Sequence, residues 1–294
     1  MIDEYIHTDL ATECRDDAGA GEAQGVIYSE VAHGAVTVSR IEIVNEEGER
    51  ALGKPRGKYI TLSFAEPWML DGEAQETLCR MLSEQLEALL YDAVPNVKTV
   101  LVVGLGNRRI TADAVGPQTL ERITVTRHLQ ALDPSLFRRV GQLSVAALTP
   151  GVLGDTGMEA ADLVAKAAET VKPDAVIVVD ALAARHVDKL GRTIQLSNSG
   201  ISPGSGVGNR RQALSKETLG VPVLALGVPT VVNSATLVRD ALSEAGIELL
   251  SSALQEVLAN GKSFFVTPKE SDAAVDALAD ILSQSLDMAL AVDR

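Results

Sequence analysis

Apolar and polar residues alternate along the first part of the chain in the way that half-buried β-strands require. Runs beginning at Gly25, Ala35 and Lys58 place apolar residues at every second position, with glycine-containing breaks between them. This pattern predicts antiparallel strands within residues 25–64. From Asp71 the apolar spacing changes to three and four residues, which predicts a helix with one buried face made by Leu78, Met81, Leu82, Leu86, Leu89 and Leu90.

The remainder of the chain alternates short apolar runs with helical patterns. Helices are predicted from about Pro117, over 158–171, from about Ser234, and after Thr267-Pro-Lys-Glu270, which has the form of a capping box. Strands are predicted at 99–103, 143–148, 175–179, 193–196 and 221–229. Such alternation is typical of an α/β fold with a mostly parallel sheet and helices on both faces. We therefore expect a single domain in which the antiparallel strands of 25–64 precede an α/β core at 98–294.

Composition and charge narrow the class of protein. The 294 residues are 46% hydrophobic and carry a net charge of −14, so no basic stripe and no direct nucleic-acid partner are expected. Two cysteines, Cys14 and Cys79, are too few for a disulfide framework or a cysteine zinc site, which favours a reducing cytoplasm. No apolar run reaches the length needed to span a bilayer, and the acidic N-terminus does not resemble a signal peptide, so no membrane partner is expected.

Two motifs suggest chemistries that their surroundings do not favour. Gly104-Leu-Gly106-Asn-Arg-Arg109 follows a strand as a dinucleotide fingerprint would, but Arg109 takes the place of the third glycine. A tight turn is the better interpretation. Gly200-Ile-Ser202-Pro-Gly204 matches the nucleophile elbow of hydrolases, which needs a helix directly after the serine. A glycine-rich loop follows instead, so Ser202 is predicted to be a loop residue.

The four histidines do not form a recognisable metal site. His7, His33, His128 and His186 lack partners at spacings such as His-Glu-x-x-His. His128 lies on a predicted helix, and His186 follows Asp180 closely. We therefore expect no metal and no cofactor, with a mixed Asp/His metal site kept as an alternative.

Asp113 and Asp180 are the best catalytic candidates that remain. Each follows an apolar run, and the carboxyl ends of parallel strands line the crevice where ligands bind in open α/β sheets. Either residue alone could be a helix cap or a turn former. If the two face each other, repulsion raises one pKa, so that one carboxylate acts as a base while the other holds a proton. Such a pair can activate water for attack on an amide.

The sequence resembles the germination protease (spore protease) family of spore-forming bacteria. The matching motifs run in order along almost the whole chain. They are Thr8-Asp-Leu-Ala11, Val103-Gly-Leu-Gly-Asn107, Asp113-Ala-Val-Gly-Pro117, Thr126-Arg-His-Leu129, Thr149-Pro-Gly-Val-Leu-Gly154, Thr156-Gly-Met-Glu159, Asp180-Ala-Leu-Ala-Ala-Arg185, Ser199-Gly200, Pro203-Gly-Ser-Gly-Val-Gly-Asn209, Gly227-Val-Pro-Thr-Val-Val232 and Val266-Thr-Pro-Lys-Glu270.

This resemblance implies a cytoplasmic endopeptidase of the forespore or spore core that degrades small acid-soluble spore proteins during germination. It implies an unusual aspartic peptidase whose two catalytic aspartates match Asp113 and Asp180. It also implies a homotetramer, and a fold similar to that of hydrogenase maturation peptidases, described as phosphorylase/hydrolase-like. Both glycine loops are candidate substrate loops. Gly104, Gly106 and Asn107 are expected to shape the loop that carries Asp113. The loop from Pro203 to Asn209, with Gly204, Ser205, Gly206 and Asn209, is expected to contact the substrate backbone or an oxyanion.

Members of the family are made as zymogens that remove their own N-terminal segment. The family cuts after an acidic residue and before an apolar one that is followed by alanine, and Thr8-Asp9-Leu10-Ala11 has this pattern. The resemblance therefore implies self-cleavage between Asp9 and Leu10. Residues 1–9 would form the propeptide, and residues 10–294 the peptidase domain.

The chain departs from the family pattern at two places. The region between about Glu244 and Ser263 is much shorter than the charged insertion of many members, which makes any oligomer contact through it doubtful. Asp155 stands where an uncharged polar residue is expected, and a third carboxylate there could alter the pH of activation. The alternatives are a metal-dependent, maturation-type peptidase and a nucleotide-binding regulator without catalytic activity.

Overall fold

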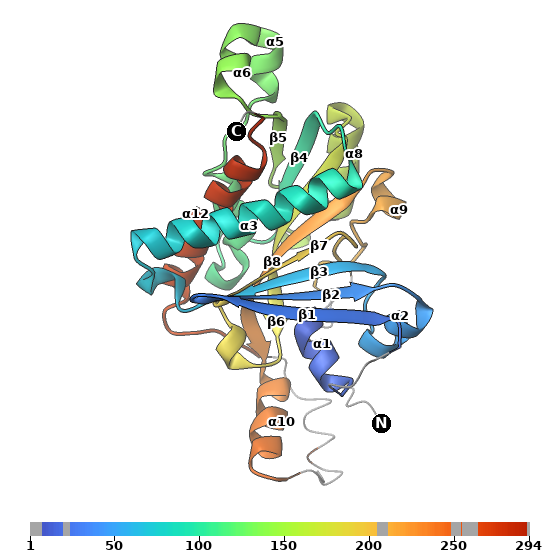
Figure 1. The fold of residues 1–294 in the computed structure, drawn as a ribbon, viewed down its shortest axis with the longest axis vertical. Coiled ribbons are helices and arrows are strands. Elements are labelled where there is room, and N and C mark those ends of the chain that lie inside the picture. Colours follow the sequence, from blue (N-terminus) through green and yellow to red (C-terminus); the bar gives the residue numbers. More distant parts are fainter. Residues whose placement is uncertain (1–7, 20–23, 205–210, 248–253, 255–263, 293–294) are drawn as a thin grey trace.

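One mixed β-sheet runs through the protein, and its strands and the loops between them carry Asp113 and Asp180 (Figure 1). The computed structural model describes residues 8–19, 24–204, 211–247, 254 and 264–292. Its strand order is β1-β2-β3-β7-β8-β6-β4-β5, and β9 pairs with β8. The strands are β1 (Val26–His33), β2 (Val36–Ile43), β3 (Gly57–Ser63), β4 (Thr99–Gly104), β5 (Ser144–Leu148), β6 (Ala175–Ala184), β7 (Thr193–Ser197), β8 (Val223–Asn233) and β9 (Phe265–Val266).

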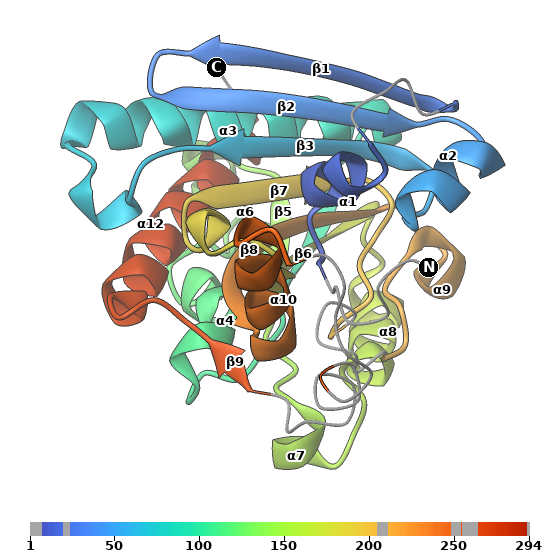
Figure 2. The same cartoon turned by 90° about the horizontal axis from the view of Figure 1, so that it is seen from below.

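Helices connect these strands and cover the sheet. The α-helices are α1 (Ala11–Asp17), α2 (Glu46–Leu52), α3 (Gly72–Ala93), α4 (Val115–Leu120), α5 (Arg127–Leu132), α6 (Pro134–Val140), α7 (Leu153–Thr156), α8 (Ala160–Val171), α9 (Lys216–Leu219), α10 (Ser234–Glu244) and α12 (Ser271–Ala289). Short 3-10 turns are η1 (Pro67–Met69), η2 (Thr111–Asp113) and η3 (Val187–Lys189). The N-terminal α1 packs against α2 and β2, and Figure 2 shows it just below β3.

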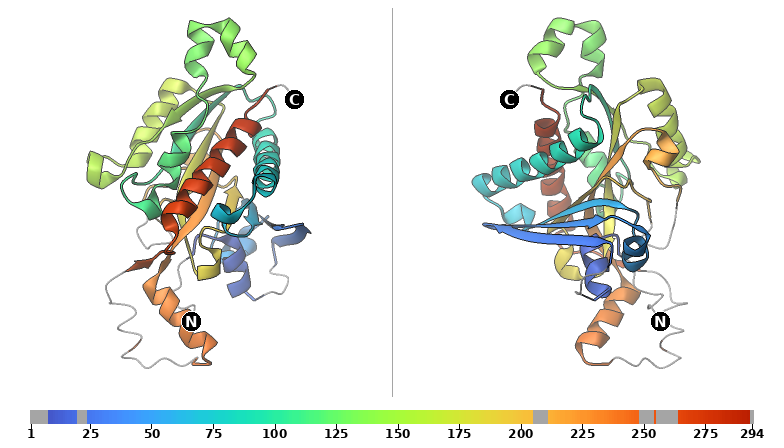
Figure 3. Two further views of the ribbon diagram at one scale, coloured as in Figure 1. Left: turned by 90° about the vertical axis from the view of Figure 1, so that its left-hand side faces the viewer. Right: turned by 45° about the vertical axis from the view of Figure 1, so that its right-hand side comes forward.

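Two apolar cores lie on opposite faces of the parallel strands. Val100 and Val102 of β4 belong to the core covered by α3, α4 and α12, whereas Leu101 and Val103 belong to the core covered by α8. This division follows from the alternation of side chains along a strand. Figure 3 shows α3 and α12 on one side of the sheet and α8 on the other. The prediction of an α/β fold with helices on both faces is confirmed.

The direction of the strands differs from the expectation of a mostly parallel sheet. Only β5, β4, β6 and β8 pair in parallel within the described residues, and β7 runs antiparallel to both β3 and β8. The antiparallel strands predicted within 25–64 join the same sheet through the β3–β7 pair. The sheet is therefore mixed, because β7 runs antiparallel to both of its neighbours and joins the antiparallel strands to the parallel ones.

Two local predictions are wrong. The run predicted as a strand over 175–179 continues as β6 to Ala184, because its pairing with β8 carries on past Asp180 with a register shift between Leu182 and Ala183. The capping box at 267–270 does not form, since the helix begins at Ser271 and Glu270 makes no side-chain cap. There the Ser271 amide binds the Pro268 carbonyl instead, in a turn that follows β9.

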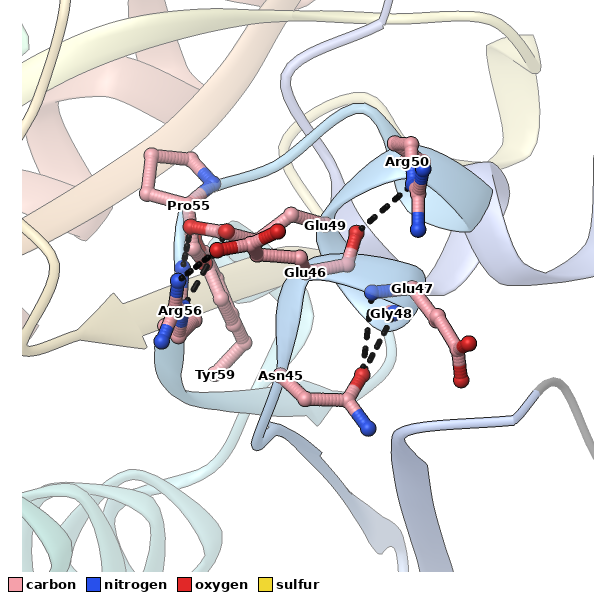
Figure 4. Close-up of polar contacts among 9 residues, drawn as sticks. All are labelled: Asn45, Glu46, Glu47, Gly48, Glu49, Arg50, Pro55, Arg56 and Tyr59. Atoms are coloured by element: carbon pink, nitrogen blue, oxygen red, sulfur yellow. Dashed lines mark hydrogen bonds and ion pairs between the residues drawn. The ribbon is translucent and has the colours of Figure 1, made fainter.

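The periodicity did not reveal α2, which shapes the turn before β3 (Figure 4). Asn45 caps this helix, with its side-chain oxygen accepting from the amides of Glu47 and Gly48 at 3.0 Å. Arg56 binds Glu49 through its side chain at 3.1 Å. The Tyr59 hydroxyl donates to the Pro55 carbonyl at 2.7 Å, and burial raises the pKa of Tyr59 to about 12. The turn at residues 53–55 is therefore held from both sides.

Gly116 provides a test of the close packing between α4 and the sheet. A Cβ atom there would lie 2.3 Å from the Leu105 carbonyl oxygen and 2.6 Å from that of Val179. We expect Gly116→Ala to lower the free energy of unfolding by about 1–3 kcal/mol, because backbone atoms must move to admit the methyl group. Urea denaturation measures the change. Gly72→Ala is the matched control, since no atom lies within 4 Å of its added Cβ and alanine favours a helix. Equal stability of the two variants would contradict this account.

Candidate active site

Asp180 lies inside β6 rather than at its carboxyl end. Its register partner is Gly227 of β8, and the preceding residue, Val179, is level with Gly104 of β4. Only 6% of Asp180 is exposed. One carboxylate oxygen accepts from the amide of Ala181 at 2.9 Å. The longer strand thus places this carboxylic acid within the sheet, where its charged form is costly.

Asp113 reaches the same region from the loop after β4. It ends η2, and its carboxylate accepts from the Asn107 amide at 2.8 Å. Gly106 has a φ of +111°, and a Cβ there would lie 2.1 Å from the Asp113 carbonyl oxygen. The Thr230 hydroxyl of β8 donates to the Ala112 carbonyl at 2.6 Å, which fixes η2 on the sheet. Gly106 and Asn107 therefore shape the loop that carries Asp113.

Electrostatics couple these aspartates and distinguish them. Burial raises the pKa of Asp180 well above its usual value, and the charges of Asp113 and Asp9 raise it further. Burial also raises the pKa of Asp113, but the Asn107 amide and the Arg211 guanidinium act in the opposite direction. Asp180 therefore has the higher proton affinity of the two carboxyl groups.

The N-terminal segment reaches the same place through Asp9. Its amide donates to the Ala183 carbonyl at 2.9 Å, and its carboxylate accepts from the Ala183 amide at 2.9 Å. The carbonyl oxygen of Asp9 accepts from Lys54 Nζ at 2.9 Å and from Gln195 Nε2 at 3.1 Å. These contacts hold the expected cleavage position in place, close enough to Asp180 for the charge of Asp9 to act on that carboxyl.

The residues after Asp9 are anchored by burial. Leu10 is fully buried, in a cluster formed by Leu182, Ala184, Leu190 and Val232. Ala11 is also fully buried, in a separate cluster with Ile41, Ile43, Leu52 and Tyr59. Glu13 secures α1, because its carboxylate accepts from the amides of Arg185 and His186 at 2.8 and 2.9 Å. Because buried clusters are closely packed, a larger side chain at position 11 is expected to require the neighbouring side chains to move.

Two cavities adjoin these residues. One of about 560 Å³ is lined by Asp9, Lys54, Leu182, Gln195, Arg211, Gly227 and others. The second, of about 380 Å³, is lined by Gly106, Asn107, Arg108, Arg109, Pro117, Glu121, Thr149, Gly151 and Asp155. The first reaches the neighbours of Asp180 and the second those of Asp113, so open space approaches the aspartates from two sides.

Other residues singled out in the sequence have different environments. Gly204 is in a loop with a φ of +72°, while Ser205, Gly206 and Asn209 fall outside the described residues, as does His7. Ser202 is an exposed loop residue without a helix directly after it, as predicted. His186 lies 3.2 Å from Asp240, whereas His33 and His128 are exposed. Asp155 is exposed and lines the second cavity.

The described residues show neither a metal cluster nor a membrane-spanning helix. Among the described residues, no group of three or more histidine, cysteine, aspartate or glutamate side chains has the arrangement of a metal site. No helix within the described ranges is long and apolar enough to cross a bilayer.

Comparisons with known proteins decide the family. The family model described as germination protease matches residues 6–245. The chain belongs to the germination protease family. A germination protease from Clostridium tetani is 38% identical, over 97% of this chain and 95% of the relative. One from Caldanaerobacter subterraneus is 39% identical, over 97% and 94%, and one from Oceanobacillus iheyensis is 43% identical, over 81% and 66%.

Membership of the germination protease family makes this chain an endopeptidase, and the predicted resemblance is confirmed. Among solved structures, a NiFe hydrogenase maturation protease from Thermococcus kodakarensis matches with a TM-score of 0.36 and 18% identity. It covers 67% of this chain and 98% of its own.

Lys54, Gln195 and Arg211 are site residues that the sequence did not reveal. Lys54 lies in the turn after α2, and nothing in the local pattern of Gly53-Lys54-Pro55 distinguishes it from a surface lysine. Gln195 offered one signal, because it is a polar residue in the buried strand β7 and is 8% exposed. A buried polar side chain in a strand needs a hydrogen-bond partner, and this requirement could have marked it.

The buried carboxyl of Asp180 makes the stability depend on pH. Its pKa in the folded protein lies above the unfolded value of about 3.9, so between these values the folded state keeps a proton that the unfolded state has lost. The free energy of unfolding therefore falls as pH rises through this range, by up to about 1.4 kcal/mol per pH unit for one proton. The Asp180→Asn variant lacks this titratable group, so its free energy of unfolding should not show this fall as pH rises.

We expect Asp180→Asn to gain stability over the wild type progressively from pH 4 towards pH 7. Urea denaturation at a series of pH values measures the difference. Asp155→Asn is the matched control, because Asp155 is exposed and its substitution should leave the pH dependence unchanged. A gain for Asp180→Asn that is the same at every pH would contradict the assignment.

Proposed function

We propose that this protein is a self-processing endopeptidase that cuts its own chain between Asp9 and Leu10 and then degrades small acid-soluble spore proteins in the spore core. The observation that carries the proposal is the position of Asp9, which is close enough to Asp180 for its charge to raise that pKa. Asp9 is thus near the carboxylic acid that is itself coupled to Asp113, which supports hydrolysis of the bond that follows Asp9. The short tether gives this segment a high effective concentration at the site.

The contacts of residues 9–11 support the expected cleavage rule. The acidic side chain of Asp9 binds the amide of Ala183. Leu10 occupies one apolar cluster, and Ala11 is buried in another. An acidic residue, an apolar residue and an alanine in this order would make the same contacts in a spore protein.

The environments of the two aspartates suggest how they divide the chemistry. Asp113, which has an amide and a nearby cation to stabilise its charge, is the base that takes a proton from water. The water oxygen bonds to the Asp9 carbonyl carbon, and the carbonyl electron pair moves onto its oxygen. When this pair returns, the bond to the Leu10 nitrogen breaks, and that nitrogen takes the proton held by Asp180. Transfer of the proton from Asp113 to Asp180 restores the starting state.

Substitution of each aspartate tests this mechanism. We expect Asp113→Asn and Asp180→Asn to slow self-cleavage by about 10²–10⁴-fold, because each removes one proton-transfer group. Mass spectrometry of protein held at mildly acidic pH follows the appearance of a chain that begins at Leu10, and a spore-protein substrate gives the rate in trans. Asp155→Asn serves as the matched control and should process normally. Near-normal cleavage by either site variant would contradict the two-aspartate mechanism.

The same assay separates the alternatives left open by the sequence. Full activity after treatment with a chelator, with metal analysis of the treated protein, supports the two-aspartate peptidase. Loss of activity that returns with added metal would indicate a metal-dependent, maturation-type enzyme. Assembly as a homotetramer also belongs to the proposal, and light scattering of the full chain measures it.

A further inference from the structure

The carbonyl oxygen of Asp9 is held by two side chains from distant parts of the chain. Lys54 Nζ lies 2.9 Å from this oxygen and Gln195 Nε2 lies 3.1 Å from it. The same Lys54 nitrogen is 3.5 Å from the Thr8 carbonyl oxygen. An ammonium and an amide N–H therefore converge on the carbonyl of the bond that the proposed function assigns to self-cleavage.

The orientation of the Gln195 amide follows from a second contact. Its Oε1 accepts from the Ala11 amide at 2.7 Å, so the donor end of the side chain must face the Asp9 carbonyl. Gln195 thus spans the bond between Asp9 and Leu10, with one group on each side. Because the residue is 8% exposed and sits within β7, its side chain has little freedom to turn away.

Lys54 is also held by the structure around it. It lies in the turn between α2 and β3, next to Gly53, which ends α2 in the left-handed conformation. Figure 4 shows how the contacts of Pro55 with Tyr59 and of Arg56 with Glu49 secure this turn. Little reorganisation is needed to bring the ammonium to the carbonyl.

The register of the sheet places Gln195 and Asp180 in one row. Gln195 of β7 is level with Gly227 of β8, and Gly227 is level with Asp180 of β6. Residues in one row of a sheet project from the same face. The donor and the carboxylic acid are therefore presented from one face of the sheet, with a glycine between them.

We propose that Lys54 and Gln195 form the oxyanion-binding pair of this peptidase. The inference rests on the proposed function, since it takes Asp9–Leu10 as the bond that is cut. When water adds to the carbonyl carbon, the electron pair of the C=O bond moves onto the oxygen. That oxygen gains negative charge in a site that already holds three carboxyl groups. Lys54 and Gln195 stabilise the charge without giving up a proton, which leaves proton transfer to Asp113 and Asp180.

The same pair would act on a separate substrate. A spore protein with an acidic residue at its cut site would place that residue's carbonyl where the Asp9 carbonyl now lies. The pair should then contribute to the rate of cleavage in trans as well as in cis. The rate of cleavage in trans therefore distinguishes an oxyanion-binding role from a role that only holds the N-terminal segment.

The test uses Lys54→Met and Gln195→Leu in the full chain. Self-cleavage is followed by mass spectrometry. The processed enzymes, obtained by long incubation and checked for an N-terminus at Leu10, are assayed on a spore-protein substrate. We expect each variant to lose about 10²–10³-fold in kcat in trans, with a KM within about threefold of the wild-type value, and to self-cleave more slowly by a similar factor. Lys54→Arg keeps a cationic donor and should therefore retain most of the wild-type kcat and rate of self-cleavage.

Matched controls show whether the effect belongs to these positions. Lys58→Met removes a lysine of β3 that pairs with Asp92, and Gln85→Leu removes a glutamine of α3 that binds Arg40, so both should keep wild-type rates. Denaturation midpoints near that of the wild type establish that the site variants are folded.

Two results would overturn the inference. One is a normal kcat in trans for both site variants with slow self-cleavage, which would make the pair a clamp for the N-terminal segment. The other is a raised KM with unchanged kcat, which would indicate binding alone. In either case Asp113→Asn and Asp180→Asn would still be inactive. Failure of the proposed function looks different, because the wild type would then not cut at Asp9–Leu10 or the aspartate variants would remain active.

Discussion

The enclosure of the Asp180 carboxyl within the sheet is the constraint on which the site depends. Strand β6 continues past this residue, so the group is buried and has one amide donor to stabilise its charge. Asp113 and Asp9 add negative charge beside it. Asp113 itself has an amide and a guanidinium to offset its own burial. Two chemically identical side chains thus acquire different proton affinities from their surroundings, which is the usual origin of an acid–base pair.

The N-terminal segment completes this arrangement. From Asp9 to Glu13 the chain is held in place, because Leu10 and Ala11 are buried in two apolar clusters and Glu13 binds the amides that follow β6. Asp9, Leu10 and Ala11 occupy, under the proposed function, the places that a separate substrate would need. Under the proposed function, residues 10 and 11 must leave these clusters before a spore protein can be cut. The same contacts then explain why the N-terminal segment occupies the site and why its own Asp9–Leu10 bond is the first to be cut.

The hydrophobic pattern predicted most strands and the longer helices, because burial on one or both faces leaves a clear period in the sequence. It predicted strand direction less well. The antiparallel course of β7 depends on which strands lie beside it, and the same run of Thr193-Ile-Gln-Leu fits either direction. The extension of β6 past Asp180 depends in the same way on continued pairing with β8. The helix α2 is short and polar, so its apolar period is too weak to recognise.

By itself, the sequence determined the α/β class and singled out Asp113 and Asp180 as catalytic candidates. Through its ordered motifs it also determined membership of the germination protease family. It also supplied the acidic, apolar and alanine pattern at residues 9–11. Tertiary structure alone decided that Asp9 lies close enough to Asp180 for its charge to act on that carboxyl. It alone decided that Lys54 and Gln195 bind the Asp9 carbonyl from 45 and 186 residues away along the chain. The reason is physical: local periodicity records which residues are buried, whereas the meeting of distant side chains depends on strand order and register.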